Sequence, residues 1–213
     1  NYALKSNIFL GNKYKIIHNG VNIMPKKEIK YINSESKIIK VISVCRFVKQ
    51  KNIEEILKIA QRMKNLKFFI IGDGPLWREI KDMIYLNKIR NVNLLGERKD
   101  VFKYLYSSDI FLSTSLYEGL PISILEAMSV GLPILASDVI GNCDTIENGK
   151  SGFLYELNNL NMATKYLKKL SESKILREKL GNSAFKRQRK FFSKNSMVSE
   201  YMKIYKMKLN WKK

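Results

Sequence analysis

The chain has 213 residues, somewhat more than the roughly 100 to 200 expected for one domain, and it fits one large domain with extensions at its ends. Hydrophobic residues make up 45% of it and charged residues 27%, while the formal net charge is +20. No apolar run approaches the roughly 20 residues of a membrane span, so we expect a soluble globular chain.

The N-terminal part precedes any regular pattern. Asn1 is not a methionine, and residues 1–10 lack the basic, apolar and small-residue order of a signal peptide, so we expect a truncated chain. The segment "YKIIHNGVNIMP", residues 14–25, predicts a separate strand and turn. The two cysteines, Cys45 in an apolar run and Cys143 in a predicted loop, have no second thiol or histidine at metal-ligand spacing. A reducing, cytoplasmic setting fits this pattern.

From residue 38 onward, apolar runs alternate with helical spacing. The run "IIKVISVC", residues 38–45, predicts a strand, and the apolar residues at 53, 56, 57, 60 and 63 predict a helix. The alternation continues to give five strands and four helices, the later strands being "KFFIIG", "VNLLG", "DIFLST" and "LPILAS". Such strands indicate a parallel sheet covered on both faces, a doubly wound, Rossmann-like α/β fold.

Ligands of such a sheet bind beyond the carboxyl ends of its strands, beside the helix N-termini. The loops predicted there are "RFVKQKN", "GDGPL", "GERKD", "SLYEGLP" and "DVIGN". Arg46 and Lys51, in the first loop, can reach the same space as the amides of Gly119 and Leu120 and the following helix N-terminus, which carry partial positive charge. This arrangement suggests a diphosphate. An exposed cationic loop without a ligand is the alternative.

A carboxylate interrupts the apolar run after the fourth strand. Pro121 suits the first turn of a helix, and Ile122, Leu125 and Met128 are expected to face the sheet, so Glu126 lies about one turn in. A buried carboxylate needs hydrogen-bond donors, which vicinal hydroxyls of a ligand would provide. Pairing with a lysine is the structural alternative. Glu118, eight positions earlier, can meet the same ligand farther out.

The short glycine pattern "GDG", ending at Gly74, lacks the third glycine of a dinucleotide fingerprint. We interpret it as a tight turn that lets a ligand approach the backbone. After the fifth strand, Asn148 and Gly149 predict a turn into a short strand, and the remaining chain shows only helical patterns, at residues 160–170, 175–192 and 197–209.

The C-terminal quarter is strongly basic, because residues 161–213 hold 16 lysines and arginines against three acidic residues. One interpretation is attraction to anionic lipid headgroups or another polyanion, which would place the protein at the inner face of the membrane. The other is a solvated surface in a lysine-rich protein. Nucleic acid is not an expected partner, because no recognition-helix, zinc or aromatic RNA-binding motif accompanies the charge.

In their order along residues 14–209, these motifs resemble the C-terminal, nucleotide-sugar-binding half of retaining glycosyltransferases of the family-four, group 1 type, which have the GT-B fold. The resembling segments are "IIHNGVN", "VCRFVKQKN", "FFIIGDGPL", the run from "VNLLGERKD" to "LPILASD", and "IENGKSGFLY". Two glutamates separated by seven residues, here Glu118 and Glu126, are the signature of that family.

The resemblance implies transfer of a hexose from a nucleoside-diphosphate sugar, with UDP favoured, to a glycan or lipid-linked acceptor. Arg46 and Lys51 would bind the diphosphate and stabilise the charge of the leaving group, and Glu118 would bind hydroxyls of the transferred sugar. Glu126 would bind the ribose diol. No protein metal is expected, because the sequence has no clustered acidic pair. The other donor-binding residues implied are Arg98, Lys99, Gly119 and Leu120, with Arg98 and Lys99 beside the base. Gly74 joins the donor-binding residues through the tight turn that lets a ligand approach the backbone.

The chain departs from the family pattern in several places. Cys45 stands where a glycine is common, and "GNCDTI" replaces the usual glycine pair and glutamate, with Asp144 the nearest substitute. The N-terminal acceptor domain is missing, so we expect the fragment to be inactive alone. His18 is assigned to a turn or structural role.

We therefore divide the chain into a remnant or linker at residues 1–13, a nucleotide-sugar-binding domain at 14–192 and a basic C-terminal helix and tail at 193–213. Two alternatives stay open. One is another GT-B enzyme, such as a nucleotide-sugar epimerase or a phosphorylase, and the other is a basic module that binds a polyanion or nucleic acid.

Overall fold

A computed structural model describes residues 16–22 and 38–210 of the chain, with side chains as far as residue 206. The N-terminal segment assigned to a remnant or linker, residues 1–13, lies outside these ranges. In the part that is described, no helix is long and apolar enough to cross a membrane.

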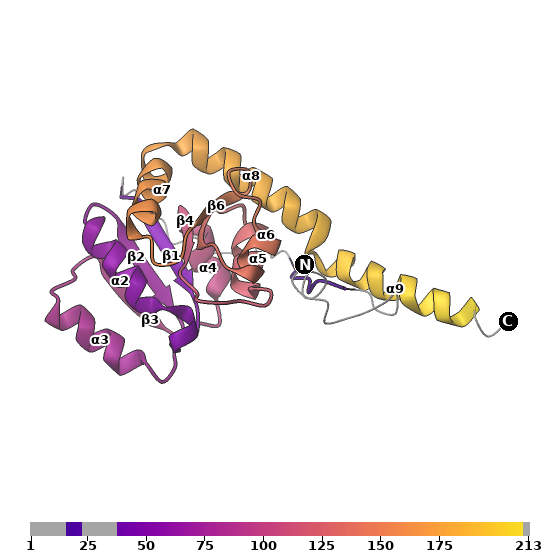
Figure 1. Cartoon of the computed structure of the whole chain (residues 1–213), viewed down its shortest axis with the longest axis horizontal. Helices are drawn as coiled ribbons and strands as arrows, with labels where there is room; N and C mark the ends of the chain where they lie inside the picture. Colours follow the sequence, from indigo (N-terminus) through magenta and orange to yellow (C-terminus); the bar gives the residue numbers. More distant parts are fainter. Residues whose placement is uncertain (1–15, 23–37, 211–213) are drawn as a thin grey trace.

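Within the described residues, the strands form one parallel sheet in the order β3-β2-β1-β4-β5-β6 (Figure 1). All five strands expected from the apolar runs are present, and so is the short strand expected after the Asn148–Gly149 turn. The strands are β1 (Lys40–Val44), β2 (Lys67–Ile71), β3 (Val92–Gly96), β4 (Ile110–Ser113), β5 (Ile134–Ser137) and β6 (Gly152–Tyr155).

Helices cover both faces of this sheet, because successive side chains of a strand point to opposite sides. Val41 of β1 belongs to one apolar core with residues of α2, α3 and α7, whereas its neighbour Ile42 belongs to a second core with α4 and α5. The doubly wound α/β fold class is confirmed. The helices are α2 (Ile53–Arg62), α3 (Trp77–Leu86), α4 (Val101–Tyr106), α5 (Ile122–Ser129), α6 (Ile140–Thr145), α7 (Leu160–Glu172), α8 (Lys174–Phe191) and α9 (Lys194–Asn210), with a 3-10 turn η2 (Lys49–Lys51).

Three expectations about local structure were wrong. Cys143 lies in α6 and not in a loop, since buried hydrogen bonds, such as that from Asn142 Nδ2 to the Ser137 carbonyl (2.9 Å), hold this helix despite its polar sequence. The described part of the expected N-terminal strand, residues 16–22, contributes only an isolated bridge from Val21 to Ser193. Ile122 is 41% exposed, because it lies in the first turn of α5, where it lines an open groove and does not pack against the sheet.

Candidate functional site

An open groove of about 680 Å³ lies at the carboxyl ends of the strands. Its walls come from the loops after β1, β2, β3 and β4 and from the start of α5, so it includes the point between β1 and β4 where the strand order reverses. Open parallel sheets bind ligands at this point. The lining residues are Val44, Cys45, Arg46, Lys51, Ile71, Gly72, Asp73, Glu97, Arg98, Val101, Glu118, Leu120, Pro121, Ile122, Ser123 and Glu126.

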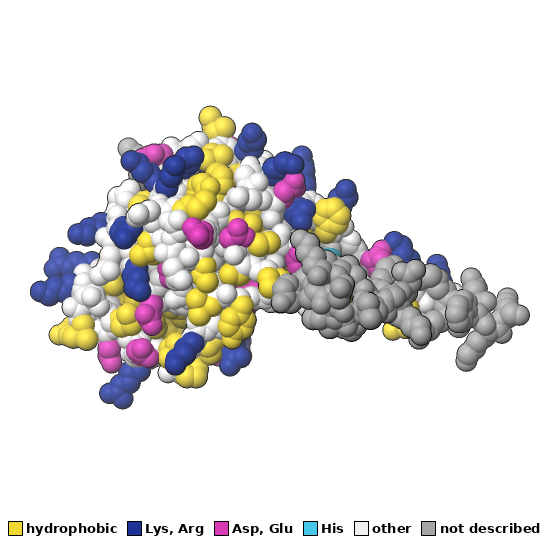
Figure 2. Space-filling view, in the orientation of Figure 1, with side chains coloured by type: hydrophobic (Ala, Val, Ile, Leu, Met, Phe, Trp, Pro, Cys, Tyr) yellow, Lys and Arg dark blue, Asp and Glu magenta, His cyan; other side chains and the backbone are white. Residues whose placement is uncertain are grey.

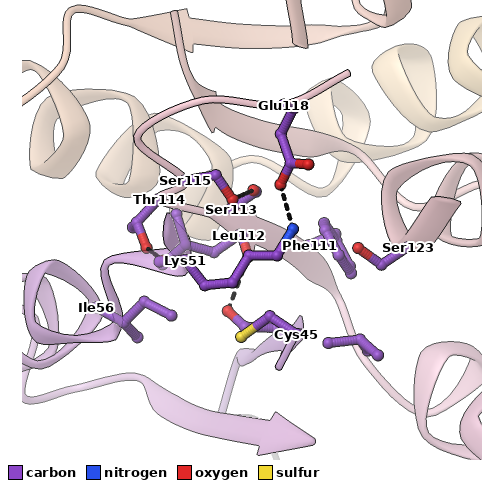
Figure 3. Close-up of a pocket in the computed structure, with 12 residues that line it drawn as sticks. Cys45, Lys51, Ile56, Phe111, Leu112, Ser113, Thr114, Ser115, Glu118 and Ser123 are labelled. Atoms are coloured by element: carbon purple, nitrogen blue, oxygen red, sulfur yellow. Dashed lines mark hydrogen bonds and ion pairs between the residues drawn. The ribbon is translucent and has the colours of Figure 1, made fainter. Parts of the chain in front are cut away.

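Lys51 and Glu118 form an ion pair at the inner end of the groove. The Lys51 Nζ lies 2.5 Å from Glu118 Oε1, and the two side chains are 19% and 8% exposed. Figure 3 shows Lys51 reaching across a small cavity of about 10 Å³ toward Glu118, with Thr114 and Ser115 on one side and Ser123 on the other. A charge-assisted bond between partly buried groups fixes both side chains before any ligand binds.

Hydrogen bonds to backbone carbonyl groups hold together the two loops that carry this pair. The amide of Leu116 donates to the carbonyl of Gln50 (2.8 Å), and Gln50 Nε2 donates to the carbonyl of Tyr117 (2.8 Å). The hydroxyl of Thr114 lies 2.9 Å from the carbonyl of Lys51. The loop after β1 and the loop after β4 therefore form one unit, although 67 residues separate Lys51 from Glu118.

Glu126 lies half-buried in α5 and lines the groove. Its carboxylate makes no hydrogen bond or ion pair with any residue that the structure describes, so the alternative of a lysine partner finds no support there. Burial raises the pKa of its carboxyl group above the usual range. The N-terminus of α5 also has no side-chain cap and no acidic residue in its first turn. This end of the groove therefore has a carboxylate that can accept hydrogen bonds, that of Glu126, near backbone N–H groups of the first turn of α5 that have no side-chain cap.

Two exposed arginines occupy the outer part of the groove. Arg46 follows β1 and has no ion pair among the described residues. Arg98 follows β3, and its guanidinium lies 5.8 Å from the centre of the Tyr104 ring. The sequence interpretation had not identified Asp73 and Glu97, which also line the groove, although each lies in one of the loops predicted to surround a ligand.

Cys45 lines both the groove and the small cavity. Burial raises the pKa of its thiol to about 12, an effect that Lys51 opposes and Glu118 increases. The thiolate, the nucleophilic form of cysteine, is therefore not populated near neutral pH. Cys45 thus forms part of the groove wall.

Some predicted site residues lie outside the groove lining. Gly74 has φ 155°, and a Cβ atom added there would lie 2.8 Å from the carbonyl oxygen of Phe47, so its place in the structure is a close backbone contact. Lys99 and Gly119 are exposed next to lining residues. His18 packs edge-on against Phe192, with ring centres 5.4 Å apart. The groove does bring together Arg46, Lys51, Arg98, Glu118, Leu120 and Glu126.

Gly141, in α6, was not identified from the sequence as a site residue. A Cβ atom at this position would lie 2.3 Å from the carbonyl oxygen of Gly119 and 2.7 Å from that of Glu118. The start of α6 thus packs directly against the backbone of the loop after β4. Gly141 is the first residue of "GNCDTI", the segment that departs from the family pattern. A glycine at this position was the feature of the sequence that could have indicated the close contact.

Comparison with known proteins gives consistent results. The family model described as "Glycosyl transferases group 1" matches residues 25–187. An Escherichia coli UDP-Gal:alpha-D-GlcNAc-diphosphoundecaprenol alpha-1,3-galactosyltransferase is 39% identical over 51% of this chain and 29% of its own length. A Staphylococcus aureus poly(ribitol-phosphate) alpha-N-acetylglucosaminyltransferase is 32% identical over 93% of this chain and 39% of its own length. The chain thus spans less than half of either relative.

Among solved structures, a mutant of Staphylococcus aureus TarM in complex with fondaparinux, alpha-GlcNAc-glycerol and UDP superimposes with a TM-score of 0.81 at 28% identity. The match covers 94% of this chain and 41% of that chain. The fold and the expected resemblance to the C-terminal domain of a GT-B enzyme are confirmed.

Proposed function

Because the chain belongs to the group 1 glycosyl transferases, we propose that it is the donor-binding half of a retaining glycosyltransferase. It would bind a nucleoside-diphosphate sugar, and the full-length enzyme would transfer the hexose to a glycan or a lipid-linked acceptor. The observation that carries the proposal is the unpaired, half-buried Glu126, facing a groove that Lys51 and Arg46 also line.

The groove offers a complementary partner for each part of such a donor. Glu126 can accept two hydrogen bonds from the ribose diol, which would supply the donors that its carboxylate lacks in the free chain. The diphosphate would lie between the cations Arg46 and Lys51 and the free N–H groups at the start of α5. Arg98, in the loop after β3, would lie beside the base.

Lys51 and Glu118 supply the chemistry proposed for the transferred sugar. Their ion pair places an acceptor of sugar hydroxyls next to a donor to phosphate. As the bond to the leaving diphosphate breaks, Lys51, Arg46 and the α5 terminus would stabilise the negative charge that develops. Loss of one such donor in other enzymes raises the barrier by about 2.7–4 kcal/mol. In this scheme the acceptor attacks the same face of the sugar and the anomeric configuration is retained.

The names of the relatives support the choice of substrates. One relative is named for UDP-Gal and a diphosphoundecaprenol acceptor, another for a poly(ribitol-phosphate) acceptor, and UDP is bound in the TarM complex. We therefore propose a UDP-sugar as the donor of this chain. An acceptor that is lipid-linked or carries phosphate groups would also suit a protein with a net charge of +20.

Calorimetric titration of the chain with UDP and a UDP-sugar tests the proposal. Glu126→Ala should weaken both ligands about equally, whereas Glu118→Ala should weaken mainly the UDP-sugar, since only the sugar conjugate carries the hydroxyls assigned to Glu118. Arg90→Ala, an exposed arginine outside the groove, is the control. Equal losses for both ligands in both variants would contradict the separate roles. A wild-type chain that binds no nucleoside diphosphate would contradict the function itself.

We also propose that the C-terminal helices hold the enzyme near an anionic membrane. Exposed cations on α8 and α9 support this, including Lys186, Arg189, Lys190 and Lys194. Over the face shown in Figure 2, however, lysines and arginines are spread out and interspersed with acidic side chains. Each lysine or arginine that lies close to an anionic membrane surface contributes about 1 kcal/mol to binding. Co-sedimentation should therefore show binding to vesicles with phosphatidylserine and none to neutral vesicles, and equal binding to both would contradict the proposal.

A further inference from the structure

A buried carboxylate outside the groove contacts the segment that carries Lys51. Glu55 belongs to α2, and only 3% of its surface is exposed. Its Oε2 accepts a hydrogen bond of 2.6 Å from the side-chain amide of Asn52, three residues earlier. Glutamates are seldom buried to this degree unless they are partnered, because removing a charged group from water is unfavourable. Glu55 therefore has a role beyond filling the core.

Tyr155 of β6 lies close to Glu55. Glu55 Oε1 and the Tyr155 hydroxyl are both buried, and neither makes a hydrogen bond of ordinary geometry. The two groups nevertheless act on each other. Burial raises the pKa of Glu55, and the Tyr155 hydroxyl opposes that rise as a donor. Burial also raises the pKa of Tyr155, and the Glu55 carboxylate adds to the rise. Tyr155 therefore keeps its proton and can offer it to Glu55.

Asn52 links Glu55 to the groove. Its backbone is in the left-handed region, with φ 48° and ψ 49°, at the junction between η2 and α2. Residues other than glycine adopt this conformation only at a cost in free energy, although asparagine tolerates it better than most. The side chain of Asn52 does not cap the α2 backbone, since its amide donates to Glu55. Glu55 thus stabilises a backbone conformation that is unfavourable by itself.

Asn52 directly follows Lys51, so its conformation helps to set the path of the backbone that carries Lys51 into the groove. The Thr114 hydroxyl lies 2.9 Å from the carbonyls of both Lys51 and Asn52, so β4 holds the same backbone from the other side. Lysine has a long, flexible side chain, and its ammonium is well placed only if its backbone is fixed. From this point the side chain spans the small cavity to reach Glu118 (Figure 3).

We propose that Glu55 is a positioning residue of the donor site, which acts through Asn52 to direct the Lys51 ammonium toward Glu118 and the donor diphosphate. Glu55 does not line the groove and would not touch the ligand. The inference rests on the proposed function, because it takes Lys51 as a ligand of the diphosphate. If it is correct, Glu55 and Lys51 contribute to the same interaction and their effects on binding are not additive.

A double-mutant cycle in the 213-residue chain tests this coupling. Glu55→Leu should weaken UDP binding roughly tenfold, within the range of coupled residue pairs, and should leave the affinity for uridine unchanged, since uridine has no diphosphate. Lys51→Ala should weaken UDP at least as much. When added to Lys51→Ala, Glu55→Leu should change the affinity for UDP less than twofold.

Two control variants separate positioning from stability. Glu54→Leu changes the exposed neighbour of Glu55, and Gln188→Leu removes a fully buried polar group of α8 that does not line the groove. Both should keep the wild-type affinity for UDP, whatever they do to the melting temperature. If Glu55→Leu does not fold, Tyr155→Phe, which removes only the hydroxyl, replaces it in the same cycle and should give a smaller loss in the same direction.

The inference would be overturned if Glu55→Leu weakened UDP binding equally in the wild-type and the Lys51→Ala backgrounds. It would also be overturned if Glu55→Leu weakened UDP and uridine equally. Unchanged UDP affinity in Glu55→Leu together with a loss in Lys51→Ala would overturn the inference and leave the proposed function standing. Unchanged affinity in Lys51→Ala would contradict the proposed diphosphate site as well.

Discussion

At the scale of single residues, the proposed site depends on Glu126 and on the ion pair between Lys51 and Glu118. The place of Glu126 on the helix after β4 could be predicted from the apolar periodicity around it, and the structure leaves its carboxylate without a partner among the described residues. The pairing of Lys51 with Glu118 could not be predicted, because it depends on two loops that are distant in sequence and meet only in the folded sheet. Local patterns thus identify residues, whereas their pairing requires the tertiary structure.

The raised pKa of Glu126 gives a prediction about stability. A carboxyl group whose pKa is higher in the folded than in the unfolded chain binds more protons when folded, so its contribution to stability falls as pH rises through these values. Glu126→Gln removes this effect. The variant should therefore gain free energy of unfolding relative to wild type at pH 7 and lose most of that gain at pH 4.

Urea unfolding of both proteins at the two pH values measures the difference, with Glu54→Gln, an exposed glutamate outside the groove, as the control. A gain that is the same at pH 4 and pH 7 would show that the charge of Glu126 is not responsible. Because the nucleotide would donate hydrogen bonds to this carboxylate, saturating UDP should reduce the advantage of the glutamine variant at pH 7.

At the scale of elements, the alternation of strands and helices could be predicted because each strand is continuously apolar and each helix has an apolar stripe. The short helix α6 could not. Its sequence, Ile140–Thr145, contains glycine, asparagine and aspartate, which favour helices weakly, and its formation depends on buried hydrogen bonds to β5 and within the helix. Tertiary contacts override local propensity here, next to the proposed site.

The packing of α6 against the loop after β4 gives a second prediction. Gly141→Ala should displace the backbone of Glu118 and Gly119, because the new methyl group would meet their carbonyl oxygens at 2.7 and 2.3 Å. We expect a loss of about 1–3 kcal/mol in unfolding free energy, typical of overpacking. We also expect weaker binding of the UDP-sugar.

Gly181→Ala is a matched control, because its methyl group would meet the carbonyl oxygen of Gly131 at 2.0 Å, away from the residues that line the groove. It should destabilise the chain without changing the affinity for the UDP-sugar. If calorimetry finds the same affinity in Gly141→Ala as in wild type, the contact with α6 does not set the geometry of this loop.

At the scale of the whole molecule, the chain contains the groove proposed to bind the donor but covers only 29% and 39% of the two curated relatives. Transfer requires an acceptor hydroxyl within about 3–3.5 Å of the sugar carbon and exclusion of water. The proposed groove is open, so the chain alone should bind a UDP-sugar with modest affinity and transfer nothing.

Incubation of the chain with a UDP-sugar and a mixed acceptor extract measures this, with release of UDP compared with an Arg46→Ala variant. Release should be the same in both. Turnover above the variant, together with a glycosylated acceptor, would show that these 213 residues form a complete enzyme and that the assignment as a donor half is wrong.

The backbone contact between Gly141 and the loop after β4 has one more consequence, for the way such a domain diversifies. The contact joins main-chain atoms and requires only that position 141 have no side chain. The nearest atoms across this contact belong to the backbone of Glu118 and Gly119, so side chains of the loop after β4 can change by mutation while the backbone contact is kept. If the groove binds a sugar as proposed, a lineage could thus acquire a preference for a different sugar through substitutions at the rim of the groove, provided that Gly141 is inherited unchanged.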